Sequence, residues 1–129
     1  MFINSTYAKQ KSNTFFTEDI YNTEIGLDIN KDVLERIYGS NITADDQLPI
    51  EFFFVSDKID NILDLQDYLK ENLSSYTQLK IQSYENLFEL SGTTNPIQMD
   101  LNSVNEWNQV MWDLGYEYDC KLNGCQVGH

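Results

Sequence analysis

The sequence has few of the side chains on which most catalytic sites depend. Of its 129 residues one is a histidine, His129, and it is the last residue. A terminal side chain is badly placed for a general base, so we interpret it as a frayed end or a cloning remnant. Acid–base chemistry would then fall to carboxylates, as in a glycosidase, and no pair of the 21 acidic residues is singled out by its position. We therefore expect the protein not to be an enzyme.

Glycine is also scarce, and none of it forms a phosphate-binding loop. The six glycines lie singly along the chain, near the expected ends of helices and strands. The acidic pair Asp45-Asp46 lacks the alternating oxygen ligands and the turn glycine of a calcium loop. We expect neither a cofactor nor a bound metal ion.

Cysteine occurs twice, at Cys120 and Cys125, and this spacing does not match a redox C-x-x-C motif. Two thiols and one distant imidazole also make no convincing zinc site. Residues 121–124 between them have the composition of a hairpin tip. A two-residue turn at Asn123-Gly124 would leave the cysteines out of register, whereas a four-residue loop would place them opposite each other and permit a disulfide. In a reducing cytoplasm we expect free thiols.

Basic residues are few: 8 Lys and Arg stand against 21 Asp and Glu, for a net charge of −13 at pH 7. Such a chain repels the phosphates of nucleic acids and an anionic membrane surface, so we expect neither as a partner. Basic proteins are the electrostatically favoured partners. The sequence also lacks an apolar run of roughly 20 residues and a signal peptide at its start, which predicts a cytoplasmic protein.

The most informative stretch runs from residue 48 to residue 73, where an apolar strand pattern passes directly into a helical one. Its carboxylates recur at steps of three and four, so on a helix they form one stripe. They are Asp57, Asp60, Asp64, Asp67 and Glu71. Ser56 stands at the expected N-cap of this helix, which we predict to end at about Ser74. The stripe is either a solvated helix face or a docking surface for a basic partner.

Before this stretch the pattern is less regular. We expect residues 1–30 to form an N-terminal arm, partly extended or disordered, in which an edge strand could start at Phe2-Ile3. Residues 14–21 have no clean period and predict a loop or a short strand, and Ile25 to Ile29 alternate as an extended segment would. A short helix should then start with Asn30 as its N-cap.

From Ile50 onward the pattern predicts strand, helix, strand, strand, helix, strand. Residues 50–55 are apolar on both faces, which places this strand in the middle of a sheet. The later elements are a hairpin of residues 77–82 and 87–91, a helix from Asp100 to Gly115 and a final strand over residues 116–122. Two helices on one face of a four-stranded antiparallel sheet is the ferredoxin-like arrangement. We predict this α+β fold for a domain of residues 31–129, which begins with the short helix and is preceded by the arm of residues 1–30.

Two aromatic side chains lie off the main apolar stripes of their predicted helices, Tyr68 and Trp112. The other aromatic residues are most simply explained as core. We consider Tyr68 and Trp112 candidate anchors for an interface, with Trp112 packed at the helix edge or exposed.

The last third of the chain resembles the C-terminal part of the RraB-like family, the regulators of ribonuclease E activity B. The segments that carry the resemblance are Asp100-Leu101-Asn102-Ser103-Val104-Asn105 at the start of a helix and Leu114-Gly115-Tyr116-Glu117-Tyr118-Asp119. Upstream, Asp32-Val33-Leu34, the strand Phe52-Phe53-Phe54 and the acidic helix follow in the family's order. The sequence departs from the family where a glycine would follow Asp119, because four residues intervene before Gly124.

The resemblance spans roughly Lys31 to Val127 and implies an acidic ferredoxin-like domain that works by binding a protein. Named members inhibit ribonuclease E by docking on its scaffold region, without catalysis. Three classes of function therefore stay open. The first is a non-catalytic regulator that covers a basic surface of a ribonuclease or RNA-processing protein, and an immunity protein against a basic toxin would have the same sequence features. The others are a small enzyme with paired carboxylates and a module that forms a homodimer.

Overall fold

The computed structural model of the chain describes residues 13–127. Within that range four helices accompany a four-stranded and a two-stranded antiparallel sheet, so the fold is mixed α/β. The helices are α2 (Glu18–Thr23), α3 (Asp28–Tyr38), α4 (Ile59–Asn72) and α5 (Leu101–Glu117). The strands are β1 (Gln47–Leu48), β2 (Ile50–Ser56), β3 (Thr77–Tyr84), β4 (Leu87–Thr93), β5 (Ile97–Gln98) and β6 (Lys121–Val127).

The larger sheet has the strand order β3-β4-β2-β6, and every neighbouring pair is antiparallel. The predicted central position of β2 is confirmed, because its two neighbours are β4 and β6. Phe52 and Phe54 on β2 are fully buried and lie opposite Gly92 and Leu90 of β4. A Cβ on Gly92 would lie 2.7 Å from the Phe52 ring and 2.6 Å from the Leu79 side chain, so the glycine leaves room for both side chains. The two-residue strands β1 and β5 pair separately.

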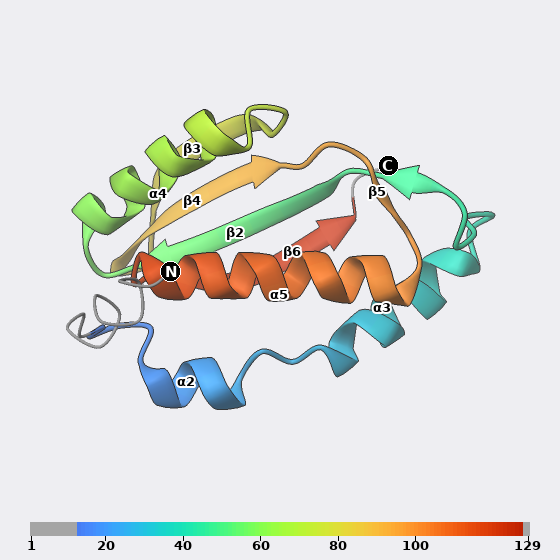
Figure 1. Cartoon of the computed structure of the whole chain (residues 1–129), viewed down its shortest axis with the longest axis horizontal. Coiled ribbons are helices and arrows are strands. Elements are labelled where there is room, and N and C mark those ends of the chain that lie inside the picture. The colour runs from blue at the N-terminus through green and yellow to red at the C-terminus, as the bar shows by residue number, and fades with distance from the viewer. Residues whose placement is uncertain (1–12, 128–129) are drawn as a thin grey trace.

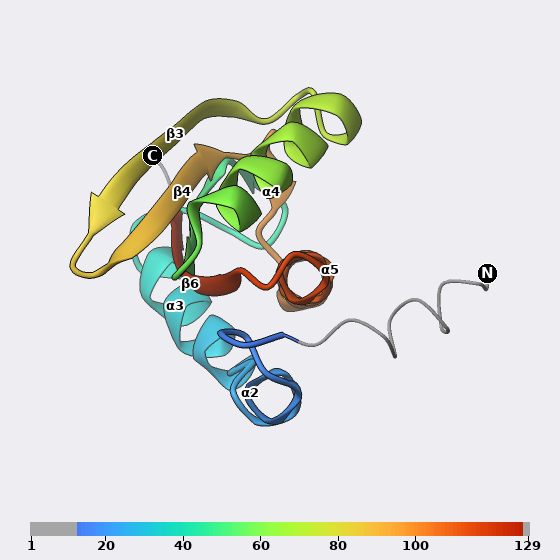
Figure 2. The same cartoon turned by 90° about the vertical axis from the view of Figure 1, so that its left-hand side faces the viewer.

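The helices form a layer in which α5 is central. Figure 1 shows α4 on one side of α5 and the α2–α3 segment on the other, and Figure 2 shows α4 and α5 on the same side of the sheet. Helix α4 buries Ile62, Leu65 and Leu69. Helix α5 is buried around most of its circumference, since it packs on the sheet and on both flanking segments. Apart from the two-residue strand β5, which was not predicted, the order β2, α4, β3, β4, α5, β6 is the one that the periodicity predicts from Ile50 onward.

Several boundaries differ from the predictions. Residues 14–21 form a loop followed by helix α2, whose N-cap Thr17 accepts a hydrogen bond from the Ile20 backbone N–H at 3.4 Å. Helix α3 starts at Asp28, so the extended segment predicted up to Ile29 is wrong at its end, and Asn30 is inside the helix instead of capping it. The expected boundary between residues 30 and 31 thus falls within α3.

The start of α4 also differs. Ser56 belongs to β2, and its hydroxyl donates to the Asp119 backbone oxygen at 3.0 Å. The helix begins at Ile59 with Lys58 at the N-cap position, so Ser56 is not its N-cap and Asp57 lies before the helix.

The predicted end of α5 and the predicted range of the last strand are both wrong. Helix α5 continues through Gly115 to Glu117, and the last strand covers residues 121–127 instead of 116–122. The reason is a close contact that only glycine allows: a Cβ on Gly115 would lie 2.2 Å from the Cys120 backbone oxygen. Residues 121–124 are therefore strand and not a hairpin tip. Cys120 is buried and Cys125 is exposed on β6, and the two thiols do not form a disulfide with each other.

Asp119, in the turn between α5 and β6, holds the segment that precedes α2. Its carboxylate accepts hydrogen bonds from the backbone N–H groups of Thr14, Phe15 and Phe16 at 3.1, 3.1 and 2.6 Å. The backbone of Asp119 has a φ of 55°, a conformation that aspartate and asparagine adopt more readily than most residues. The expected edge strand at Phe2-Ile3 and the frayed His129 lie outside the described residues.

Candidate protein-docking surface

Helix α4 presents four of the five predicted carboxylates on its outer side. Asp60, Asp64, Asp67 and Glu71 are all exposed, and so is Asp57 just before the helix. Because Ile62, Leu65 and Leu69 hold the opposite face of α4 against the core, the carboxylates point away from the sheet. The structure thus places the acidic stripe at the surface on a firmly packed helix.

The stripe carries a nearly uncompensated negative charge. Among the residues that the structure describes, Asp57 is its one member in an ion pair, with the Lys58 Nζ 3.7 Å from its carboxylate. Both side chains of that pair are about half exposed, so the pair contributes little to stability. Asp60 lies in the first turn of α4, where the positive end of the helix dipole favours a carboxylate.

Tyr68 lies on the flank of α4 beside this stripe. It is half-buried, and its ring packs against Tyr118 with centroids 5.9 Å apart. A half-buried tyrosine next to exposed carboxylates has the position that an interface anchor needs, and this role stays a prediction.

Trp112 does not have such a position: of the two alternatives, packing at the helix edge and exposure, the structure excludes exposure. Its side chain is 2% exposed, because the segment before α2 covers it. Phe16 packs edge-on against its ring at 4.6 Å, and its indole N–H donates to the Tyr21 backbone oxygen at 2.9 Å. Trp112 is a core residue that joins α5 to the N-terminal segment and offers no surface to a partner.

Helix α5 adds carboxylates that the sequence reading missed. Glu106, Asp113 and Glu117 are exposed, with Val110 between them 57% exposed. These carboxylates are seven and four residues apart, which places them on one face of a helix. This pattern is missed in the sequence because the same helix carries a stronger apolar stripe. Since α4 and α5 both pack on the sheet, these side chains extend the negative charge of the helix layer beyond α4.

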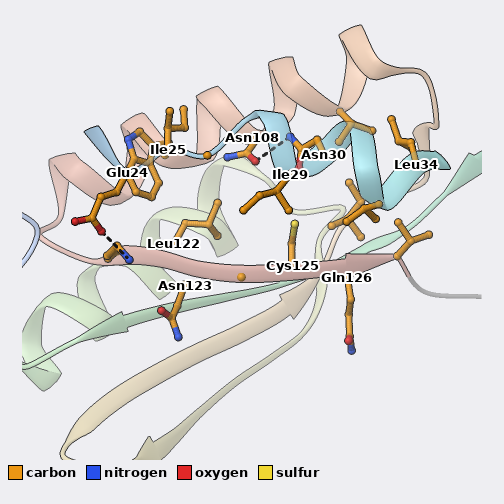
Figure 3. Close-up of a pocket in the computed structure, with 18 residues that line it drawn as sticks. Glu24, Ile25, Ile29, Asn30, Leu34, Asn108, Leu122, Asn123, Cys125 and Gln126 are labelled. Atoms are coloured by element: carbon orange, nitrogen blue, oxygen red, sulfur yellow. Dashed lines mark hydrogen bonds and ion pairs between the residues drawn. The ribbon is translucent and has the colours of Figure 1, made fainter. Parts of the chain in front are cut away.

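A cavity of about 260 Å³ lies on the other side of α5, between α3 and β6. Figure 3 shows Asn30 and Asn108 above it and Leu122 and Cys125 pointing into it from the strand below. Glu24 is the one carboxylate among its lining residues and pairs with the Lys121 Nζ at 3.7 Å. Paired carboxylates of the kind a glycosidase uses therefore do not meet in this cavity.

The Cys125 thiol belongs to this cavity. The residue as a whole is exposed, but its sulfur points toward the helices, where burial raises the pKa of the thiol. A thiol with a raised pKa is mostly uncharged at neutral pH and a weak nucleophile there.

Within residues 13–127 no group of three or more metal-ligating side chains gathers at one point, and no helix is long and apolar enough to cross a bilayer. One comparison with known proteins identifies a relationship. A family model described as regulator of ribonuclease activity B matches residues 27–127. That range begins just before α3 and ends with the last residue of β6, so it takes in the whole sheet. No curated protein matches the chain.

Proposed function

The chain belongs to the RraB family, the regulators of ribonuclease activity B, and from this membership we propose that it is a non-catalytic inhibitor that docks on a basic surface of a ribonuclease. The exposed stripe on α4 is the observation that carries the proposal. The stripe attracts a basic surface over a distance and orients it before contact, while Tyr68 provides apolar area beside the charges.

Rigidity of the stripe supports this function. The side of α4 that faces the core is made of fully buried aliphatic residues, so the helix does not have to become ordered when a partner binds. A surface that is already ordered loses little conformational entropy on association, which leaves more of the electrostatic attraction as affinity.

The target that the resemblance favours is ribonuclease E, a protein of the cytoplasm, and we infer that the chain acts there. We also infer a ferredoxin-like domain. The strand order β3-β4-β2-β6 and the two helices on one side of the sheet support that assignment.

Reversal of three charges tests the proposed surface. The variant Asp60→Lys, Asp64→Lys, Asp67→Lys should keep the thermal unfolding midpoint within a few degrees, because all three side chains are exposed. Its affinity for ribonuclease E, measured by surface plasmon resonance, should fall at least about tenfold, since like charges would then face each other. Inhibition of RNA cleavage in a purified assay should be lost in parallel.

A matched control exists on α3. Asp28, Asp32 and Glu35 have the same spacing, are also exposed and also begin in the first turn of their helix. Reversal of these three to lysine changes the net charge equally and should leave the affinity several-fold closer to wild type. Equal losses for both triple variants would show that net charge matters and the α4 stripe does not. An unchanged affinity for the α4 variant would remove the stripe from the interface.

A further inference from the structure

The cavity between α3 and β6 combines apolar walls with two buried amides that keep unused hydrogen-bonding atoms. Asn30 is 6% and Asn108 7% exposed. The Asn30 Nδ2 donates to the Asn108 Oδ1 at 3.1 Å and to the Asn105 Oδ1 at 2.9 Å. Within the described part of the chain, the Asn108 Nδ2 and the Asn30 Oδ1 form no hydrogen bond. Since neither atom is among the buried atoms that lack a partner, both are accessible to solvent, and one donor and one acceptor are available at the cavity.

The strand beneath the cavity is the edge of the sheet. Strand β6 pairs with β2 alone, so along its other side the backbone N–H and C=O groups have no strand partner among the described residues. The register shifts between Phe53 and Phe54, which leaves Asn123 without an opposite residue. Beyond this bulge β6 is exposed up to Gln126, and a Cβ added at Gly124 would meet no atom within 4 Å. This half of the strand is therefore accessible to solvent.

We propose that this cavity binds an extended peptide segment, which pairs with the free edge of β6 and inserts one large apolar side chain between α3 and β6. A peptide supplies a neutral donor and a neutral acceptor at each residue, which matches both the strand edge and the two unused amide atoms. The inserted side chain is uncharged, because Glu24 and Lys121, the cavity's charged residues, already pair with each other. A volume of about 260 Å³ is large enough for one large apolar side chain.

This site is distinct from the acidic surface of α4. Helix α5 separates the two, with α4 on one side and α3 on the other (Figure 1). The inference goes beyond the proposed function, since a peptide can bind at β6 whether or not the stripe on α4 contacts a ribonuclease. A protein with both sites can hold two segments of one partner or of two partners.

Selective alkylation of Cys125 tests the site. Benzyl bromide at a pH of about 9 should modify Cys125 and spare Cys120, because Cys120 is buried, and the benzyl group should fill the cavity. A phage-displayed library of random heptapeptides is then selected on the full chain and on the benzylated chain, after circular dichroism has shown that the modified protein stays folded. We expect the unmodified chain to enrich peptides with a large central apolar residue. A synthetic copy of the best peptide should bind the benzylated chain at least about tenfold more weakly.

Two variants complete the test. In Cys125→Ser the same treatment should leave peptide binding unchanged, which shows that the loss comes from position 125. Asn108→Asp should weaken the peptide at least about tenfold, because it removes the unused donor and keeps the oxygen that accepts from Asn30. Absence of enrichment, equal enrichment on both proteins, or peptides without a large apolar residue would each overturn the proposal. A dimer in analytical ultracentrifugation that benzylation converts to monomer would assign the site to a second copy and also overturn it. A co-purified small molecule that benzylation displaces would also overturn the proposal.

Discussion

At the scale of single residues, Gly115 decides how the C-terminal part of the chain folds. It lies inside α5, where glycine is normally unfavourable by about 1 kcal/mol relative to alanine. Here the missing Cβ lets the Cys120 backbone return to the helix, and the Cys120 N–H donates to the Gly115 oxygen at 2.8 Å. The contact on the other side is the Phe54 ring, 3.0 Å from the position that a Cβ on Gly115 would take. A residue that looks like a helix end in sequence is therefore a packing requirement.

Gly115→Ala should destabilise the protein, although helix propensity alone predicts a gain. The added Cβ would lie 2.2 Å from a backbone oxygen, which no side-chain rotation relieves, so we expect a loss of about 1–3 kcal/mol or more. Differential scanning calorimetry should show a midpoint lower by about 4 °C for each kcal/mol. Gly124→Ala is the control, because its Cβ would enter open space, and its change should stay within about 0.5 kcal/mol. Equal midpoints for the two variants would contradict the close contact as the reason for this glycine.

At the scale of elements, the N-terminal segment is part of the helix layer. The short helix α2 is joined to α5 by the hydrogen bond from the Tyr21 hydroxyl to Asp113 at 2.5 Å and by the Tyr21 and Tyr116 rings, 4.5 Å apart. Asp119 holds the residues before α2 through three backbone N–H groups. Helices this short do not persist alone, so these long-range contacts are what keep α2 folded.

The Tyr21–Asp113 contact gives α2 a measurable pH dependence. The hydrogen bond to Asp113, with burial and the Asp113 charge, raises the pKa of Tyr21 from 10.0 to about 12. Because the native pKa is above the unfolded one, the contribution to stability is present below pH 10 and is lost as the pH rises through about 12. In Asp113→Ala, NMR titration of the labelled tyrosine ring should give a pKa closer to 10. Tyr38, whose pKa is raised by burial and by Asp100, is the internal control and should not move. A Tyr21 pKa that stays near 12 in the variant would exclude Asp113 as the cause.

At the scale of the whole molecule, the exposed carboxylates and the apolar cavity lie on different parts of the surface. The net charge of −13 acts over distances comparable with the Debye length, so it accelerates the approach of any basic partner. The helix layer concentrates exposed carboxylates on α4 and α5, while the cavity beside β6 is mainly apolar and its two charged residues are paired. In our two proposals, long-range attraction belongs to the α4 surface and short-range recognition to the cavity.

Added salt should lower the association rate constant of the proposed ribonuclease complex. Between roughly 20 and 500 mM NaCl the association rate constant, measured by stopped-flow fluorescence, should fall at least about tenfold, because the Debye length contracts to a few ångströms. The dissociation rate constant should change much less. The α4 triple-lysine variant should show a weaker salt dependence than the α3 triple-lysine variant. An association rate independent of salt in the wild type would contradict electrostatic steering.

The features that the sequence determined by itself follow from local periodicity and from charge. The central position of β2 follows from its apolar residues on both faces, and the β3–β4 hairpin follows from alternation around a short turn. The N-cap at Asp100 follows from residue type, and its carboxylate does accept the Ser103 N–H at 2.7 Å. The exposed stripe on α4 is predicted because carboxylates and aliphatic residues share one helical period. Each of these features depends on residues close together in the chain, so a single sequence is enough to predict it.

The features that only the tertiary structure decided depend on contacts between residues far apart in the chain. Trp112 is buried because Phe16 and the Tyr21 backbone cover it, and no local pattern indicates that contact. The end of α5 and the register of β6 depend on the approach of Cys120 to Gly115. The cavity exists because α3, α5 and β6 meet there, with Asn30 and Asn108 brought together from separate helices. The local periods allow several arrangements, and the packing of distant segments selects one of them. Periodicity alone therefore does not predict which arrangement forms.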